Sequence, residues 1–357
     1  MNILREKIHN IIIENGPISI ASFMEISLSD KKYGYYRKKM PLGSKGDFVT
    51  SPDISQIFGE IIGIWILDIW IKLKEPSNFQ IVDLGGGRGT LLKDINRVLK
   101  NKVSDFVFID INEELIKLQK KALNGAKHFE KINDIPKKPT IFIGNEFLDT
   151  FPVHQFIKKN NYWKEVCVNS DKKKLFFSYE TTKLSKKLIS SNFDNLKEDS
   201  IIEINFKIRE IINNISNFIK KNSGAAIFFD YGYLDGHGDS FQGIKDNKPI
   251  NPLSDPGFVD LTSHVNFKDI KLQAEKNNIN FYGPNTQSLF LEEMGAIQRL
   301  RILERNAKDH QRKDLRIGLN RLMSDKEMGN LFKVIALSSK NFPSLEGFTC
   351  GTTTNKE

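Results

Sequence analysis

Cysteines and long apolar runs are both scarce in this sequence of 357 residues. The two cysteines, Cys167 and Cys350, stand far apart, so they have no metal-binding spacing and suit a reducing compartment. No run reaches the roughly 18 apolar residues that cross a bilayer, because polar residues interrupt the longest candidate, residues 54–73. The first residues also lack the apolar segment of a secretory signal. We therefore expect a cytoplasmic protein that does not span a membrane.

Several familiar chemistries are missing as well. The six histidines form no pair with metal-ligand spacing, and neither a G-x-S-x-G motif nor a Cys-His nucleophile pattern is present. We expect no metal site.

Acidic residues are fewer than basic ones, 44 against 53, which gives a net charge of +9. Such a balance can indicate a nucleic-acid partner or an anionic membrane surface. Here the excess is mostly lysine and is spread along a chain that is also rich in Ile, Asn and Phe. We interpret it as the compositional bias of a solvated surface, and we expect no nucleic-acid partner.

The middle of the chain alternates short apolar runs with amphipathic segments. Strands are predicted at residues 81–84, 106–110, 126–129, 140–144 and 225–230, and helices at 90–99, 113–121 and 206–220. This alternation indicates an α/β fold with a parallel, Rossmann-like sheet whose ligands bind at the carboxyl ends of the strands.

The flanking regions follow other patterns. Helices are predicted at 4–14, at 20–28, and from Ser51-Pro52 to about residue 73; a β-hairpin at 163–168 and 175–179; a long loop at 231–256; and helices at 265–277, 287–293 and 296–323 before a last strand at 331–337. We divide the chain into an N-terminal helical lid region, 1–76, a cofactor-binding core, 77–150 and 201–264, a β-rich insertion, 151–200, and a C-terminal substrate-shaping region, 265–357.

The segment from Asp83 to Thr90 is a strand end, a glycine-dense turn and a helix start. Glycines at 85, 87 and 89 permit positive φ and close ligand approach, while the helix start can hold a carboxylate. Asp83 can accept a hydrogen bond from an ammonium group. Thr90 breaks the dinucleotide pattern G-x-G-x-x-G. The loop therefore favours S-adenosylmethionine (SAM) over NAD, with a plain strand-to-helix turn as the alternative.

Further acidic and polar residues follow the other strands. Asp110, at the end of the second strand, is predicted to bind the ribose hydroxyls, although it could instead cap the next helix. Asp134 is placed where it could reach the adenine amino group. Asn145, after the fourth strand, is assigned to the cofactor site.

Glu146 and Asp149 form a carboxylate pair beside Asn145. Paired carboxylates suit a planar guanidinium, which they can bind bidentately, so we assign them to the acceptor. Helix capping by Asn145 or Asp149 is the alternative. His264 is a candidate proton acceptor or substrate clamp, or else a structural histidine.

The chain resembles the MidA-like SAM-dependent methyltransferases, whose mitochondrial member is the arginine methyltransferase that assists assembly of respiratory complex I. The matching stretches are residues 46–52, 54–60, 83–91, 145–153, 230–232, 256–267 and 328–333. The family usually has Glu and Pro where Asp83 and Gly86 stand, and commonly Glu where Asp110 stands.

The resemblance implies a class I methyltransferase fold, SAM as cofactor, and an arginine of a protein as acceptor. It also implies that the protein partner is a complex I (NADH dehydrogenase) subunit, and that Gly46, Asp47 and Ser51 are lid or cofactor contacts. Three alternatives remain: a methyltransferase acting on a small molecule or nucleic acid, a non-catalytic SAM-binding assembly factor, and an NAD-dependent oxidoreductase.

Overall fold

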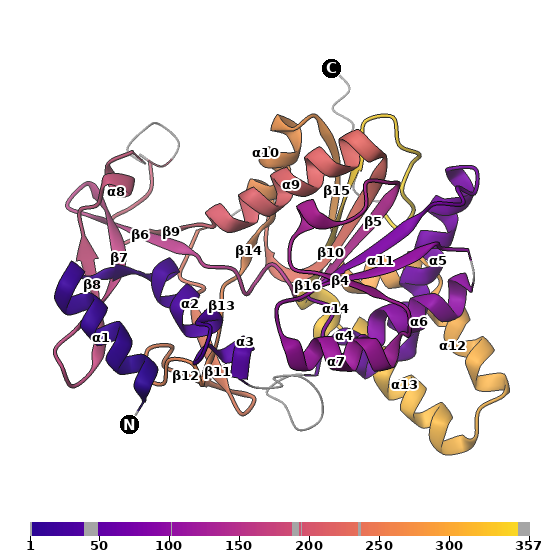
Figure 1. The fold of residues 1–357 in the computed structure, drawn as a ribbon, viewed down its shortest axis with the longest axis horizontal. Helices are drawn as coiled ribbons and strands as arrows, with labels where there is room; N and C mark the ends of the chain where they lie inside the picture. Colours follow the sequence, from indigo (N-terminus) through magenta and orange to yellow (C-terminus); the bar gives the residue numbers. More distant parts are fainter. Residues whose placement is uncertain are drawn as a thin grey trace.

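The computed structural model describes residues 2–38, 49–100, 102–187, 193, 195–234 and 237–348. Figure 1 shows a larger lobe, in which helices flank a fan of strands, and a smaller lobe that contains the N-terminal helices and most of the antiparallel strands. The cofactor and acceptor residues predicted from the sequence come from the larger lobe and from the segments that join the two.

The larger lobe is built on one sheet with the order β15-β16-β10-β5-β2-β3-β4, and β14 (Val265–Asn266) pairs with the end of β10. The five strands β4 (Lys127–Phe129), β3 (Asp105–Ile109), β2 (Gln80–Leu84), β5 (Thr140–Asn145) and β10 (Gly224–Tyr233) run parallel. This confirms the predicted α/β fold and its parallel strands.

The far edge of this sheet departs from the prediction. The last strand, β16 (Phe332–Ser339), runs antiparallel between β10 and β15 (Ile279–Thr286). The sequence did not predict β15, because its Asn, Gly and Pro residues have weak strand propensity. Pairing with β16 is what makes this segment a strand.

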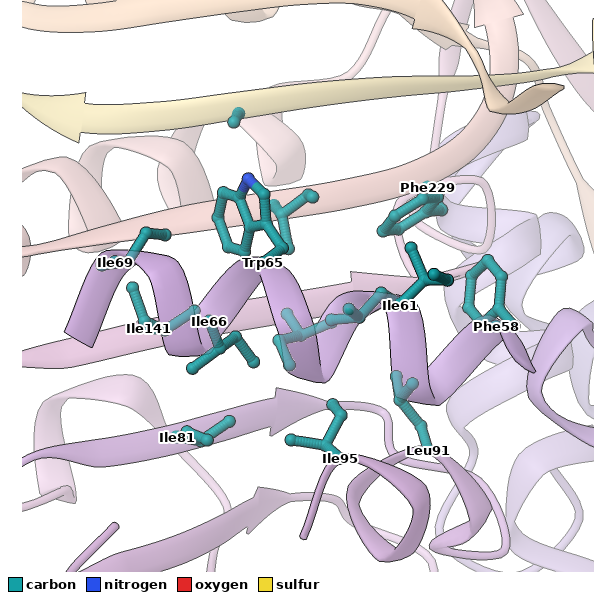
Figure 2. Packing of buried hydrophobic residues seen from close by; sticks show 14 of the residues in the cluster. Phe58, Ile61, Trp65, Ile66, Ile69, Ile81, Leu91, Ile95, Ile141 and Phe229 are labelled. Carbon is teal, nitrogen blue, oxygen red and sulfur yellow. The ribbon is translucent and has the colours of Figure 1, made fainter. Parts of the chain in front are cut away.

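Helices cover both faces of the sheet. The helices α9 (Phe206–Asn222) and α10 (Phe267–Lys276) pack on one face, and α5 (Gln56–Lys72) and α6 (Thr90–Leu99) pack on the other. In Figure 2, Ile66 of α5 points toward Ile141 and Ile81 of the strands, whereas Trp65 points toward the neighbouring strands of the sheet. Successive apolar residues of each strand point to opposite faces of the sheet, so one strand packs against the helices on both sides.

The helix predicted to start at Ser51-Pro52 is two helices. Ser51 lies inside the short α4 (Ser51–Ile54), whose N-cap is Thr50, and α5 begins after an extended residue, Ser55. The Ser55 hydroxyl accepts a hydrogen bond from the Ile57 N–H at 3.3 Å and so caps α5. Apolar periodicity could not reveal a break of one residue.

The predicted hairpin is confirmed as β7 (Tyr162–Ser170) and β8 (Leu175–Glu180), followed by α8 (Lys183–Lys187). It belongs to a larger five-stranded sheet with β1 (Ile18–Ser19), β6 (His154–Lys159) and β9 (Ile201–Ile204). The helices α1 (Ile3–Asn15) and α2 (Ile20–Ser29) pack against this sheet. The region predicted as 1–76 is therefore divided, because α5 packs in the larger lobe.

The segment predicted as a loop at 231–256 contains two strands, so that prediction was wrong. The strands β11 (Gln242–Lys245) and β12 (Lys248–Ile250) form a three-stranded sheet with β13 (Asp260–Thr262). Asp246 and Asn247 make the turn between them with φ of 52° and 59°. Asp and Asn tolerate this left-handed conformation, which two-residue hairpin turns require.

The C-terminal part also contains more elements than predicted. The helix α11 (Gln287–Glu293) has its predicted bounds, whereas the helix predicted at 296–323 is divided into α12 (Ala296–Arg305) and α13 (Asp309–Met323). The described residues also include α7 (Glu113–Ala122) and the short elements α3 (Tyr35–Lys38), the 3-10 turn η1 (Ile132–Asp134) and α14 (Met328–Leu331). Within the described ranges, no helix is both long enough and apolar enough to cross a membrane.

Candidate active site

A cleft of about 1150 Å³ opens at the carboxyl ends of β2, β3, β5 and β10. Its lining includes residues of the glycine-rich turn, of the loop after β5, and of α2 and β13 from the opposite side. The volume slightly exceeds the usual range for small-molecule sites, about 300–1000 Å³. The cleft can therefore hold a cofactor together with part of an acceptor.

The glycine-rich turn has the backbone that its sequence predicts. Gly85, Gly87 and Gly89 have φ of 64°, 52° and 83°, all in the left-handed region that favours glycine. Gly85 and Gly87 line the cleft. Gly89 does not; a Cβ there would lie 3.0 Å from the Ala122 Cβ of α7 (Glu113–Ala122), so this glycine brings α7 close to the turn.

Asp83 lies at the end of β2 and lines the cleft with 1% of its surface exposed. Its Oδ2 atom is buried and has no hydrogen-bond partner among the described residues. Burial and the nearby charge of Asp110 raise the pKa of Asp83 well above its usual value. A buried carboxyl oxygen without a partner is costly, and a ligand ammonium group would satisfy it. Asp83 thus fits the amino group of SAM.

Asp110 follows β3 and also lines the cleft. Its Oδ1 accepts a hydrogen bond from the Asn112 N–H at 2.9 Å, and its Oδ2 accepts one from the Gln119 amide at 2.7 Å. Burial raises the pKa of Asp110, while these two donors lower it. Asn112 itself caps α7, so helix capping does not account for Asp110. The carboxylate faces the cleft and can accept a hydrogen bond from a ribose hydroxyl.

One other residue assigned to the cofactor, Asp134, is not brought to the cleft. Asp134 is exposed at the end of η1 and lies outside the cleft lining, where Ile132 and Asn133 stand instead. Gly46, like Asp47, lies outside the described residues, so its assignment stays a prediction.

The carboxylate of Glu146 lies at the start of the loop after β5, where the residue has φ of 50°. Its Oε1 accepts hydrogen bonds from the Ser51 N–H at 3.3 Å and from the Asn145 amide at 3.1 Å. Burial, and then the charge of Asp149, raises the pKa of Glu146 to about 7. The carboxylate is therefore poised to change protonation near neutral pH.

Asp149 lies on the same wall with 4% of its surface exposed. Its Oδ2 accepts a short hydrogen bond from the Tyr231 hydroxyl, and its Oδ1 is buried without a hydrogen-bond partner in the described part of the chain. Burial raises the pKa of Asp149 to about 6. No helix begins at Asn145 or Asp149, so neither residue caps one.

The loop that carries both carboxylates is held by Asp230, which is fully buried in β10. Its Oδ2 accepts hydrogen bonds from the N–H groups of Phe147 at 3.1 Å and Leu148 at 2.8 Å. The sequence did not assign a role to Asp230 or Tyr231. The only available signal was their presence in a stretch shared with the MidA-like family.

His264 is exposed and lines the cleft beside Tyr231, with 5.6 Å between the two ring centroids. Its predicted catalytic role is compatible with this position and stays a prediction. Tyr36 of α3, which the sequence did not single out, also lines the cleft and donates a hydrogen bond to Asp260 at 2.7 Å. No group of three or more His, Cys, Asp or Glu side chains in the described ranges could hold a metal ion.

Comparisons with known proteins agree with this geometry. Residues 61–285 match the family described as "Putative S-adenosyl-L-methionine-dependent methyltransferase". The mitochondrial protein arginine methyltransferase NDUFAF7 of Homo sapiens is 33% identical over 91% of this chain and 81% of its own length. The homolog in Drosophila melanogaster is 32% identical over 91% of this chain and 82% of its own length.

A solved structure shares the whole fold. A Burkholderia thailandensis protein bound to S-adenosyl-homocysteine superposes with a TM-score of 0.84 and 22% identity, covering 96% of this chain and 93% of that protein. Together with the family match, the glycine turn and the unpartnered Asp83, this shows that the chain belongs to the MidA-like family of SAM-dependent methyltransferases, which includes the NDUFAF7 proteins.

Proposed function

We propose that this chain transfers methyl groups from SAM to an arginine side chain of a polypeptide. The relatives that match over most of its length are named protein arginine methyltransferases. The proposal also rests on the acceptor wall of the cleft, where Glu146 and Asp149 lie beside Asn145.

One observation carries the choice of acceptor. The Oδ1 atoms of Asn145 and Asp149 are both buried and have no hydrogen-bond partner among the described residues. No ion pair in the described part of the chain joins Glu146 or Asp149 to a cationic side chain. A guanidinium carries only donors and a positive charge, so it would satisfy all these groups at once.

The same residues fit the chemistry of nitrogen methylation. Bound SAM supplies an electrophilic methyl group: a nitrogen–carbon bond forms while the sulfur–carbon bond breaks and its electron pair returns to sulfur. The carboxylates of Glu146 and Asp149 would hold the guanidinium charge away from the reacting nitrogen and orient its lone pair. Glu146, with a pKa of about 7, could accept the proton that the nitrogen loses.

We further propose that the acceptor polypeptide is a subunit of a complex I-type NADH dehydrogenase. The family resemblance and the matches to proteins named NDUFAF7 support this partner. The cytoplasmic location expected from the sequence stays a prediction, which cell fractionation would test.

The test is to supply the protein and methyl-labelled SAM to a lysate from cells that lack this chain, and then to hydrolyse the labelled material. Label is expected in methylated arginine. Glu146→Gln is expected to abolish this labelling while S-adenosyl-homocysteine still binds. The matched control is Glu292→Gln, a change of the same kind on the exposed surface of α11.

Other outcomes identify the alternatives. Label in RNA or in a small molecule would refute the arginine acceptor and keep the methyltransferase. Cofactor binding without any transfer, together with full biological function of Glu146→Gln, would instead identify an assembly factor that does not catalyse.

A further inference from the structure

Gln119 of α7 links the two parts of the cofactor site. Its side chain is fully buried. Its Nε2 donates hydrogen bonds to the backbone carbonyl of Gly87 at 2.9 Å and to Oδ2 of Asp110 at 2.7 Å. One amide therefore joins the glycine-rich turn after β2 to the carboxylate after β3.

The contacts of α7 with the neighbouring loops fix the position of the Gln119 amide. A Cβ at Gly89 would lie 3.1 Å from the Cα of Gln119, so the turn and the helix are in close contact. At its other end, α7 is capped by Asn112, whose side chain accepts hydrogen bonds from the N–H groups of Glu114 and Leu115. The helix is thus fixed to the turn on one side and to the loop that follows Asp110 on the other.

We propose that Gln119 is a positioning residue for the cofactor, and that its amide sets the Asp110 carboxylate and the Gly87 carbonyl in the arrangement that accepts the ribose and methionine parts of SAM. The proposal requires that the chain binds SAM, and it does not depend on the identity of the acceptor.

The residue type suits this role. The Asn112 N–H and the Gln119 amide donate to different oxygens of Asp110, so together they hold the carboxylate in one orientation where it lines the cleft. An arginine or lysine at position 119 would form an ion pair with Asp110 and compete with the ribose hydroxyls. A neutral amide orients the carboxylate without neutralising it.

The charge state of Asp110 gives the proposal a distinctive signature. The titratable groups that interact electrostatically with Asp110 are Asp83 on β2 and His128 on β4, and Lys120 of α7 in turn interacts with His128. A substitution at position 119 leaves the side chains of Asp83, His128 and Lys120 in place. A ratio of variant to parent affinity at each pH therefore isolates the effect of the amide.

The experiment measures the Kd of S-adenosyl-homocysteine by calorimetry at about pH 6 and about pH 8, on either side of neutrality. Gln119→Met keeps the volume and removes both hydrogen bonds. We expect its Kd to rise by about tenfold to a hundredfold, or about 1.4 to 2.8 kcal/mol. The loss relative to the parent should be larger at the lower pH, because Asp110 without its donor protonates more readily.

Gln119→Glu should show the opposite pH dependence. At the higher pH its carboxylate repels Asp110 and weakens binding, whereas at the lower pH a shared proton restores a donor and binding recovers. Lys117→Met is the matched control, because Lys117 lies on the exposed face of α7 and its Nζ pairs with Glu114. Its Kd is expected to equal that of the parent.

The outcomes separate positioning from packing. An unchanged Kd in Gln119→Met, or equal pH trends in the Met and Glu variants, would overturn the proposal. If Gln119→Met fails to fold, the pH trend of Gln119→Glu decides alone. If the methyl acceptor proves not to be arginine, the ratios of variant to parent Kd for S-adenosyl-homocysteine should be unaffected.

Discussion

Removing the Tyr231 hydroxyl is expected to shift the pH dependence of the reaction. This hydroxyl donates to Oδ2 of Asp149, whose Oδ1 has no hydrogen-bond partner among the described residues. A hydrogen bond to a charged group contributes about 1.5 to 3 kcal/mol, which corresponds to about 1 to 2 pKa units. In Tyr231→Phe, the pKa of Asp149 should therefore rise from about 6 to roughly 7 or 8.

The sign of the effect follows from the charge that the acceptor needs. A guanidinium binds the ionised carboxylate, so a higher pKa removes the binding form at neutral pH and restores it in more alkaline solution. The acid limb of kcat/KM for the acceptor should move upward by about 1 to 2 pH units. Because Asp149 lies beside Glu146, whose pKa is about 7, the limb reports the pair rather than one residue.

The assay is a pH profile of methyl transfer to the acceptor polypeptide. S-adenosyl-homocysteine affinity should be unchanged, because Tyr231 acts on the acceptor wall. Tyr162→Phe, a substitution of the same kind at a residue with 67% exposure, serves as the control. An unmoved acid limb, or a loss of equal size at every pH, would refute the assigned link between Tyr231 and Asp149.

Two further predictions concern stability and the glycine turn. The pKa of Glu146 is higher in the folded state than its ordinary 4.5, so the folded protein loses stability as the pH rises through about 4 to 7. Glu146→Gln should therefore raise the free energy of unfolding by about 1 to 3 kcal/mol at about pH 8 and by little at about pH 4. Urea denaturation at both pH values measures this difference. Gly89→Ala should destabilise the protein by about 1 to 2 kcal/mol, because Gly89 has φ of 83° and a Cβ there would lie 3.0 Å from Ala122. The test is thermal unfolding of this variant beside the control Gly238→Ala, where a Cβ meets nothing within 4 Å. Equal stability of the two variants would contradict the packing role of Gly89.

The sequence by itself determined the features that depend on local order along the chain. Strand and helix periodicities located the parallel core, and the glycine turn with Asp83 and Asp110 identified the cofactor. These succeed because a strand, a positive-φ turn and a helix start each depend on neighbouring residues. Glu146 and Asp149 were located at the cleft from their position after the fourth strand, because the carboxyl ends of parallel strands meet at one edge of the sheet.

Only the tertiary structure decided which side chains complete the site. Gln119 is near Gly87 and Asp110 because α7 packs against the turn, and Tyr231 is near Asp149 because β10 lies beside β5. Asp134 was assigned to the cofactor from its spacing, yet η1 leaves it exposed. Long-range contacts also made strands of β11 and β15, whose local sequences favour turns and loops. Such contacts join residues far apart in the chain, and the periodicity and motifs of one segment do not record them.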